Sequence, residues 1–397
     1  MVSIKRFFIL LCCFFIQTIS VSQPWIPVPD FPGIGRDDGC VFVIGNKAYC
    51  GSGQNVSYIS LGDFYSINMS TDAWDTIASM PAGTERQYAS AVSSAGLGYV
   101  FGGINGSTYL NSLLSYDPAS DTWNTKTPMP AAARMGCASF IINGIAYFAG
   151  GRTSTAISIK EVWAYDILND SWTQKNDLPF GARWRAASTE QNNKGYLLFG
   201  RDENGRFCNE LLEYDPLTDV WNVLSTFPGP GRSYTSMVSI SDDLVMIGGL
   251  DTTGANYNDM WRINVDTLSW QELDSIPSAG RRGGICFNSV SSVYYTTGIT
   301  QAGSRLKESW KIANPTLIDE TMLNHELSLY PNPVREQLYI ETHCNDCAFE
   351  IVNILGQKQT CQVSDNSINV AELSQGIYFL KVFSERRLIG VKKFVKG

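Results

Sequence analysis

The chain has 397 residues and a formal net charge of −8 at pH 7, with 17% charged and 12% aromatic residues. Nucleic-acid-binding proteins present a basic surface, so an acidic chain without a basic cluster argues against that class of partner. Only two histidines occur, His325 and His343, which limits the acid–base and metal chemistry that the chain can perform near neutral pH.

The first 22 residues have the three parts of a secretory signal peptide. Lys5 and Arg6 precede an unbroken apolar run over residues 7–16, and small and polar residues follow up to Ser22. Ten apolar residues are too few to cross a hydrocarbon core about 30 Å thick, which argues against a membrane anchor. We therefore expect export through the periplasm, removal of residues 1–22 and no transmembrane segment in the mature chain.

Cysteine is sparse for an exported protein. Eight cysteines follow the signal segment, and they are Cys40, Cys50, Cys137, Cys208, Cys286, Cys344, Cys347 and Cys361. This number is too small for a disulfide scaffold in a chain of this length. Cys344 and Cys347 form a CxxC, but without a second such pair a zinc site is not expected. A local disulfide that involves Cys361 and unpaired buried thiols are the two alternatives.

Residues 25–312 contain an internal repeat of 49 residues. A tryptophan returns at this interval at Trp25, Trp74, Trp123, Trp172, Trp221 and Trp270. A proline follows each tryptophan by seven residues, and an arginine follows by eleven in all repeats except the second, where Glu85 takes that place and Arg86 comes next. At offset 38 stands an Asp or Glu, which Ser112 replaces in the second repeat. Such regular spacing indicates a repeat architecture.

Each repeat has the pattern of four β-strands. In the third, residues 137–151 form two apolar stretches around Asn143-Gly144, a pair typical of a type I′ hairpin. Residues 160–166 then alternate in polarity, a turn follows, and the next strand begins at Trp172. No helical periodicity interrupts these segments. Four-stranded sheets with a period near 50 residues predict the blades of a β-propeller, because such a sheet buries both faces only when neighbours stack against it.

The repeats resemble the kelch family in two features. The first is a pair of glycines at Gly102-Gly103, Gly150-Gly151 and Gly248-Gly249. The second is a Tyr-Asp pair with a following tryptophan, seen in Tyr116-Asp117 with Trp123, Tyr165-Asp166 with Trp172, and Tyr214-Asp215 with Trp221. The first and last repeats depart from the pattern, with Gly51-Ser52-Gly53 and Thr297-Gly298. The resemblance implies an all-β, six-bladed kelch propeller over residues 23–313.

The ends of the repeat region predict how the ring closes. A seventh tryptophan would fall at position 319, where Asp319 stands, so the last repeat lacks its outer strand. The segment around Trp25 precedes any complete blade, and we expect it to supply that strand. Pro27 and Pro29 suit this role, because proline in a sheet is confined to edges.

Strand direction places the candidate ligand residues. Connections two apart in an antiparallel sheet emerge on the same face, so the offset-11 arginines and offset-38 acids share one face. We expect them to form ion pairs that lock each blade, with a charged ligand site as the alternative. Residues of that face that break the repeat are better candidates for binding, and they are Tyr88, Trp184, Arg185, Arg201, Tyr234 and Arg282. Aromatic rings and arginine forks suit an acidic sugar or a carboxylate-bearing peptide.

Residues 25–312 contain no histidine, which argues against His-ligated metals and against Ser–His or Cys–His nucleophile pairs. We therefore predict no catalytic residue, metal or cofactor, and favour a binding module for a carbohydrate or protein ligand. Kelch-type propellers that interconvert sialic acid anomers work without metal, so the resemblance makes a metal-free mutarotase the enzymatic alternative. Glu85, Glu190, Asp202 and Glu203 are the acid–base groups available to it.

The C-terminal part carries a second resemblance. Residues 314–326 form a polar linker, and the alternation in residues 327–397 predicts a small β-sandwich. Four motifs, at residues 330–334 (YPNPV), 353–356 (NILG), 373–378 (LSQGIY) and 392–395 (KKFV), resemble the type A sorting domain of the type IX secretion system of Bacteroidota. The resemblance implies that the secretion machinery binds this domain at the outer membrane and that the domain is usually removed. We therefore expect a secreted or outer-surface protein.

Overall fold

The computed structural model describes residues 24–313, 327–342, 347–353, 358–359, 361–364, 367–384 and 387–397. The expected signal peptide and linker lie outside the described residues. Contacts divide the chain into a propeller unit, Gln23–Thr316, and a unit that contains Leu317–Gly397. Regular structure in the described ranges consists of strands, and these ranges hold no helix long and apolar enough to cross a membrane.

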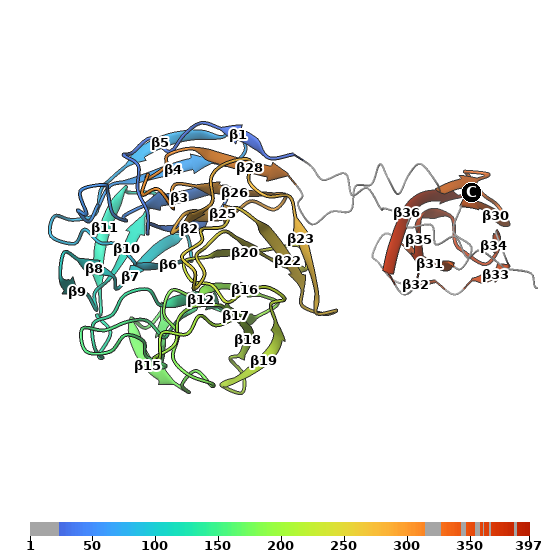
Figure 1. Cartoon of the computed structure of the whole chain (residues 1–397). Helices are drawn as coiled ribbons and strands as arrows, with labels where there is room; N and C mark the ends of the chain where they lie inside the picture. The colour runs from blue at the N-terminus through green and yellow to red at the C-terminus, as the bar shows by residue number, and fades with distance from the viewer. Residues whose placement is uncertain are drawn as a thin grey trace, which may run out of the picture. The chain divides into compact units, whose positions relative to one another are not determined.

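Six four-stranded antiparallel sheets form the propeller, one for each repeat (Figure 1). From the centre outward, blade 1 consists of β2 (Cys40–Ile44), β3 (Lys47–Gly51), β4 (Phe64–Asn68) and β5 (Ala73–Ile77). Blade 2 consists of β6 (Ser90–Ser94), β7 (Leu97–Phe101), β10 (Leu113–Asp117) and β11 (Thr122–Lys126). Blade 3 consists of β12 (Ala138–Ile142), β13 (Ile145–Ala149), β14 (Val162–Asp166) and β15 (Ser171–Lys175). The all-β propeller predicted from the repeat is therefore confirmed.

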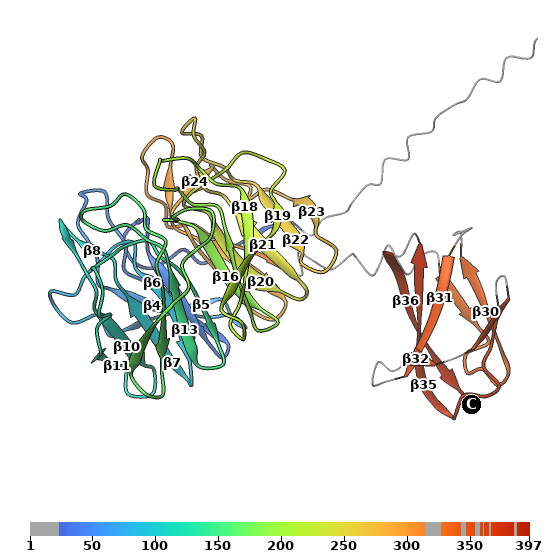
Figure 2. The same ribbon diagram turned by 90° about the horizontal axis from the view of Figure 1, so that it is seen from below.

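In the same order, blade 4 consists of β16 (Ala187–Gln191), β17 (Lys194–Leu198), β18 (Glu210–Asp215) and β19 (Val220–Thr226). Blade 5 consists of β20 (Ser236–Ile240), β21 (Asp243–Ile247), β22 (Met260–Asn264) and β23 (Ser269–Leu273). Blade 6 consists of β25 (Ile285–Asn288), β26 (Ser292–Thr296), β28 (Ser309–Ala313) and β1 (Ile26–Val28). Two short pairs lie in the loops, namely β8 (Ile104–Asn105) with β9 (Thr108–Tyr109) and β24 (Arg281–Arg282) with β27 (Ile299–Thr300). Figure 2 shows β24 beyond the ends of the blade strands.

Strand β1 closes the ring. It pairs antiparallel with β28, with Ile26 opposite Lys311 and Val28 opposite Ser309. The indole Nε1 of Trp25 donates a hydrogen bond of 2.8 Å to the carbonyl oxygen of Asp274, which follows blade 5. The expected closure by the N-terminal segment is confirmed.

The repeated tryptophans join neighbouring blades. Trp123 and Trp172 each donate a hydrogen bond of 2.8 Å to a carbonyl oxygen 45 residues earlier, on the preceding blade. An aspartate in the turn before the tryptophan adds a second link. Asp170 accepts hydrogen bonds from the Tyr165 hydroxyl of its own blade and from the Thr127 amide of the preceding blade. The regular spacing of tryptophan within the chain thus follows from the geometry of the blade joints.

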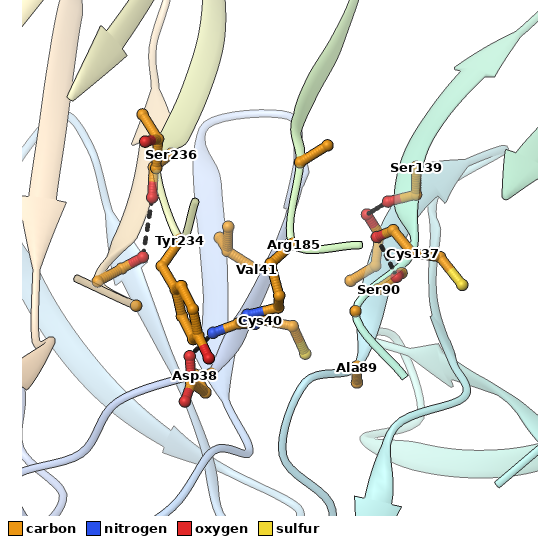
Figure 3. Close-up of a pocket in the computed structure, with 17 residues that line it drawn as sticks. Asp38, Cys40, Val41, Ala89, Ser90, Cys137, Ser139, Arg185, Tyr234 and Ser236 are labelled. Carbon is orange, nitrogen blue, oxygen red and sulfur yellow. Dashed lines mark hydrogen bonds and ion pairs between the residues drawn. The ribbon is translucent and has the colours of Figure 1, made fainter. Parts of the chain in front are cut away.

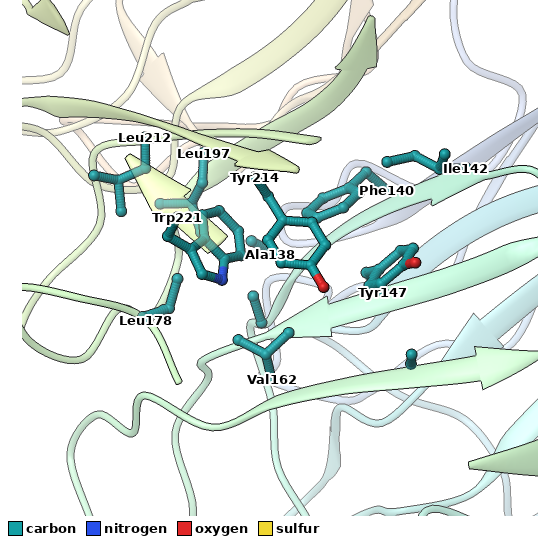
Figure 4. Packing of buried hydrophobic residues seen from close by; sticks show 12 residues of the cluster. Ala138, Phe140, Ile142, Tyr147, Val162, Leu178, Leu197, Leu212, Tyr214 and Trp221 are labelled. Carbon is teal, nitrogen blue, oxygen red and sulfur yellow. The ribbon is translucent and has the colours of Figure 1, made fainter. Parts of the chain in front are cut away.

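Aromatic side chains fill the space between the blades (Figure 4). Between blades 3 and 4, Phe140 stacks on Tyr147 with ring centroids 5.3 Å apart, and Tyr214 and Trp221 pack against this pair. A Cβ on Gly195 of the second strand of blade 4 would lie 2.2 Å from the Phe140 ring. The close approach of the two sheets therefore requires glycine at position 195.

The C-terminal unit is a β-sandwich, as predicted from its alternating segments. Its two sheets have the orders β29-β30-β34-β33 and β32-β31-β35-β36. The strands are β29 (Leu327–Tyr330), β30 (Gln337–Thr342), β31 (Cys347–Asn353), β32 (Lys358–Gln359), β33 (Gln362–Ser364), β34 (Ser367–Asn369), β35 (Gly376–Ser384) and β36 (Arg387–Lys396). Leu338, Ile351 and Leu380 are among the buried residues of its core.

Six cysteines of the described ranges are unpaired. Cys361 has a free thiol, as do Cys40, Cys50, Cys137, Cys208 and Cys286. Of the two alternatives, a disulfide through Cys361 is therefore not formed, and unpaired thiols are found. Burial raises the pKa of the Cys40 thiol to about 11, which keeps it protonated and unreactive. Cys344 of the CxxC lies outside the described residues.

Candidate functional site

The repeated arginines are buried structural residues. Arg36, Arg86, Arg134, Arg183, Arg232 and Arg281 are each at most 2% exposed. Arg36 donates to both carboxylate oxygens of Asp63, at 2.7 and 2.6 Å. Burial by itself would raise the pKa of Asp63, but the hydrogen bonds and charge of Arg36 lower it below the usual value. The expected ion pair is confirmed in five of the six blades.

Blade 2 lacks the carboxylate of this pair. Arg86 donates instead to the Ser112 hydroxyl at 3.3 Å and to the Gly102 carbonyl at 3.1 Å. Glu85 does not replace the missing partner, because its carboxylate accepts hydrogen bonds from the Gly83 amide and the Asn105 side chain. Burial lowers the pKa of Arg86 to about 10.

One residue from each blade contributes to a closed ring of backbone hydrogen bonds around the propeller axis. These residues, which we call the mouth ring, are Asp38, Tyr88, Gly136, Arg185, Tyr234 and Gly283. The amide of each donates to the carbonyl of the ring residue on the preceding blade, and Asp38 closes the circle on Gly283, at 2.8–3.2 Å. All six have φ between 58° and 64°, the left-handed region that bulky residues seldom adopt.

Four side chains of the mouth ring fill the axis of the propeller, and we call them the axial plug. Arg185 of blade 4 forms an ion pair with Asp38 of blade 1 (Figure 3). Its guanidinium lies between the rings of Tyr88 and Tyr234, 4.2 and 4.1 Å from their centroids. The side chain of Asp38 is 0% exposed and that of Arg185 is 12% exposed. Burial lowers the pKa of Arg185 to about 10 and raises the pKa of Tyr88.

The two glycines of the mouth ring leave room for the axial plug. A Cβ on Gly136 would lie 2.8 Å from Cδ of Arg185, and one on Gly283 would lie 2.5 Å from Oδ1 of Asp38. Tyr88, Arg185 and Tyr234, which the sequence predicts as ligand-binding residues, are thus brought together. They contact one another as one packed unit.

Trp184 lies behind the axial plug rather than on the surface. Its side chain is 4% exposed and packs with Ile104 and Met135. The indole also meets the rings of Tyr88 and Tyr234 edge-on, at centroid distances of 6.2 and 5.9 Å. A ligand on this face cannot reach the indole, so Trp184 supports the tyrosines of the axial plug.

Arg282 is an exposed arginine beside the axial plug. Its guanidinium lies 5.2 Å from the centroid of Tyr234, and its side chain is 30% exposed. Asp37 is held mainly by Arg305, at 2.6 Å, whereas the contact of Arg282 with Asp37 is 3.8 Å long. Arg282 therefore keeps hydrogen-bond donors that a ligand can use.

Arg201 has a counterpart that sequence reasoning missed. Arg152 and Arg201 occupy the same repeat position in blades 3 and 4, and their backbones bridge to Met135 and Trp184 next to the mouth ring. Arg152 lies 5.6 Å from the Trp184 ring, and Arg201 lies 4.9 Å from the Phe207 ring. In the part of the chain that the structure describes, neither has a carboxylate partner. Their shared offset of 29 from the repeat tryptophan is the signal that could have identified Arg152.

The acid–base candidates do not form a catalytic group with the axial plug. Asp202 accepts a hydrogen bond from Arg206 Nε at 3.1 Å, and Glu203 accepts one from the Ala182 amide at 2.8 Å. Glu190 lines a cavity between the inner strands of the blades. No contact between described residues joins these carboxylates or Glu85 to the axial plug. Within the described residues, no group of three or more His, Cys, Asp or Glu side chains could hold a metal ion.

The mouth face, by which we mean the face that carries the mouth ring, presents guanidinium groups beside carboxylates such as those of Asp37 and Asp202. Arg152, Arg201 and Arg282 lack a short ion pair there, in a chain whose net charge is −8. A guanidinium without a carboxylate partner attracts anions and can form charge-assisted hydrogen bonds with them. The arrangement can therefore bind an anion.

Comparisons with known proteins agree with this architecture. Residues 6–177 match the KLHDC2/KLHL20/DRC7 Kelch-repeats domain, and residues 328–397 match the secretion system C-terminal sorting domain. The solved structure of YjhT is similar, with a TM-score of 0.62 and 20% sequence identity over 71% of this chain and 95% of that chain. At this identity the similarity shows the fold alone. No curated protein matches the chain.

Proposed function

We propose that this chain, a secreted or surface kelch-repeat propeller that carries a type IX sorting domain, is a binding module whose mouth face recognises an anionic ligand. The ligand class is an acidic sugar or a peptide with a free carboxylate. One observation supports this most strongly. Arg152, Arg201 and Arg282 lie around the axial plug, stacked on aromatic rings and without a short ion pair.

Stacked guanidinium groups suit this task for a physical reason. The planar fork of arginine matches the two oxygens of a carboxylate, and such bidentate, charge-assisted hydrogen bonds are the strong ones. A guanidinium already held against a ring loses less freedom when it binds, so less of the binding free energy is spent on ordering the side chain. The rings also offer apolar surface to the carbon skeleton of a sugar or peptide.

The predicted residues take different roles in this proposal. The ligand is contacted by the predicted residues Arg201 and Arg282 and also by Arg152. The partly exposed Tyr234 lies beneath Arg282. Tyr88 and Arg185 form the floor of the site as parts of the axial plug. Trp184 acts through the tyrosines that it supports and does not touch the ligand.

A binding screen tests the class of ligand. The full chain is exposed to acidic glycans, to their neutral counterparts and to peptides with free or amidated C-termini. We expect binding only to ligands with a carboxylate, and we expect it to weaken as salt screens the charges. Equal binding of the acidic and neutral members of each pair would contradict the proposal.

The enzymatic alternative, a metal-free sugar mutarotase, makes a separate prediction. Its activity would accelerate the exchange between the anomers of N-acetylneuraminic acid, which NMR follows directly. A binding module leaves this rate unchanged while it still binds the sugar. A clear acceleration that Arg282→Ala abolishes would favour the enzyme over the module.

A further inference from the structure

The channel on the other side of the axial plug is closed at one end. Directly beneath the plug lies a cavity of about 170 Å³, and a second of about 350 Å³ continues along the inner strands. The two share Val41, Ala91 and Ser139 in their walls, so they are neighbouring parts of the channel that the inner strands surround. Ser93 and Glu190, near the far ends of the inner strands, are partly exposed. Solvent therefore reaches the channel from the end opposite the mouth ring.

The wall of this channel offers hydrogen-bond acceptors. Hydroxyl groups of the inner strands donate across the blade joints to carbonyl oxygens, from Ser93 to Val43, from Ser139 to Ala91 and from Ser188 to Ser139, at 2.5–3.3 Å. A hydroxyl has one hydrogen and two lone pairs. When the hydroxyl hydrogen of a serine already bonds to a carbonyl of the neighbouring blade, that hydroxyl can only accept a hydrogen bond from a ligand.

Glu190 adds negative charge to this wall. Among the described residues that line the 350 Å³ part of the channel, it is the one with a charged side chain. Its Oε1 accepts a hydrogen bond of 2.9 Å from the Asn193 amide, and no hydrogen bond from a described residue reaches Oε2. Val43 and Ile141 occupy the corresponding repeat position in blades 1 and 3. The carboxylate is thus specific to blade 4 and is not part of the blade architecture.

The floor of the channel adds one further acceptor, which lies beside the guanidinium of Arg185. Oδ1 of Asp38 contacts Arg185 in the axial plug. Oδ2 of the same carboxylate is buried without a hydrogen-bond donor, and Asp38 lines the cavity beneath the plug. A buried carboxylate oxygen without a donor is costly, so a ligand that brings a donor to this place is stabilised.

We propose that this channel binds a slender organic cation through a primary ammonium group held by Glu190. An ammonium group carries three donors, no acceptor and a positive charge, which complements a wall of acceptors with one carboxylate. The small side chains of the wall admit an unbranched chain. The channel and the mouth face then select opposite charges, and the axial plug separates the two sites. This inference does not depend on the anionic ligand proposed for the mouth.

Calorimetric titration of the full chain with 1,4-diaminobutane tests the inference, with 1,4-butanediol as the uncharged control. We expect one diamine to bind per chain and the diol not to bind. Glu190→Gln should weaken the affinity for the diamine by roughly tenfold or more, as expected for the loss of a charged hydrogen bond. Glu272→Gln removes the same charge from an exposed position of β23 and should leave the affinity unchanged.

A steric variant and a mouth variant complete the test. Ala91→Leu narrows the channel without a change in charge and should also abolish diamine binding, whereas Arg282→Ala should leave it intact. Thermal unfolding of each variant shows that the propeller is still folded. Failure of the wild type to bind the diamine, or equal binding by Glu190→Gln, would overturn the inference. Equal weakening by Glu272→Gln would also overturn it, because it would show attraction to the acidic surface in general.

Discussion

Arginine occurs in this propeller in two settings with different consequences. Inside the blades, Arg36 and its repeat equivalents are buried, and in five blades they are paired with a carboxylate. Around the mouth, Arg152, Arg201 and Arg282 stack on aromatic rings instead. The first setting stabilises the blade and buries the guanidinium out of reach of a ligand. The second keeps donors available, and it occurs only where the sequence departs from its repeat.

The unpaired Arg86 gives a prediction about stability and pH. We expect Ser112→Glu to supply the missing carboxylate and to raise the free energy of unfolding by about 1–2 kcal/mol at pH 7. The paired carboxylates Asp63 and Glu161 have pKa values below their usual range in the folded state. Their stabilisation is therefore present above the unfolded pKa, near 4, and is lost as the pH falls through the lowered folded pKa.

Urea unfolding at pH 7 and at acidic pH measures both effects. The gain from Ser112→Glu should disappear in acid, where the new carboxylate is protonated. Ser112→Gln, which has similar size and no charge, should not reproduce the gain at pH 7. A gain that is equal for Glu and Gln would contradict the ion-pair explanation.

The packing of the axial plug gives a second prediction at the residue scale. Gly136 and Gly144 both have positive φ, 64° and 79°, but only at Gly136 would a Cβ meet a neighbour, Cδ of Arg185 at 2.8 Å. Both alanine substitutions should cost about 1 kcal/mol for the left-handed backbone. Gly136→Ala should cost about 1–3 kcal/mol more, because it overpacks the plug. Equal losses in chemical denaturation would show that Arg185 does not pack against position 136.

At the scale of strands and blades, the sequence predicted regular features well. The hairpin at Asn143-Gly144 has φ values of 50° and 79°, as a type I′ turn requires, and β1 completes blade 6. The repeat allowed both features to be predicted. The hairpin depends only on local turn residues, and the closure follows from the number of strands in each repeat.

The mouth ring could not be predicted in the same way. Its members lie 48–50 residues apart, and their contact depends on how six blades converge on one axis. The alternating direction of the strands predicted that Trp184 lies on the ligand-binding face. The left-handed backbone of Arg185, φ 58°, turns that side chain toward the axis and leaves Trp184 buried behind it. A positive φ at a bulky residue such as arginine leaves no signal in a single sequence.

Closure by β1 predicts the effect of a deletion. Without residues 23–33, β28 loses its outer partner and Asp274 loses the hydrogen bond from Trp25. Each blade packs on two neighbours only in a closed ring, so we expect cooperative thermal unfolding to be lost. Deletion of residues 327–397, which belong to the other unit, is the control and should leave the propeller transition in place. An unchanged melting curve after deletion of 23–33 would contradict closure by this strand.

At the scale of the whole molecule, the chain joins two units with separate cores. The propeller core lies between the blades, and the sandwich core lies between the two C-terminal sheets. In our proposal, the sorting domain supplies the route of export and the propeller supplies the binding surface. The tasks are therefore expected to separate by truncation.

Truncation in a bacterium with a type IX secretion system tests this division. We expect a chain that ends at residue 313 to fold but to stay inside the cell envelope, because the segment that matches the sorting domain is missing. The full chain should reach the medium or the outer surface. Quantification of the propeller outside the cells compares the two. Equal external amounts would show that export does not need residues 327–397.

The binding proposal depends most directly on where an anionic ligand makes contact. We would measure the affinity of the strongest acidic ligand from the screen for the wild type, for Arg201→Ala/Arg282→Ala, and for Lys47→Ala/Lys126→Ala as a charge-matched control away from the mouth ring. The arginine variant should bind about tenfold or more weakly, since it loses charge-assisted hydrogen bonds, and the lysine variant should bind as the wild type does. Equal affinity of all three proteins would place the ligand elsewhere and contradict the proposed site.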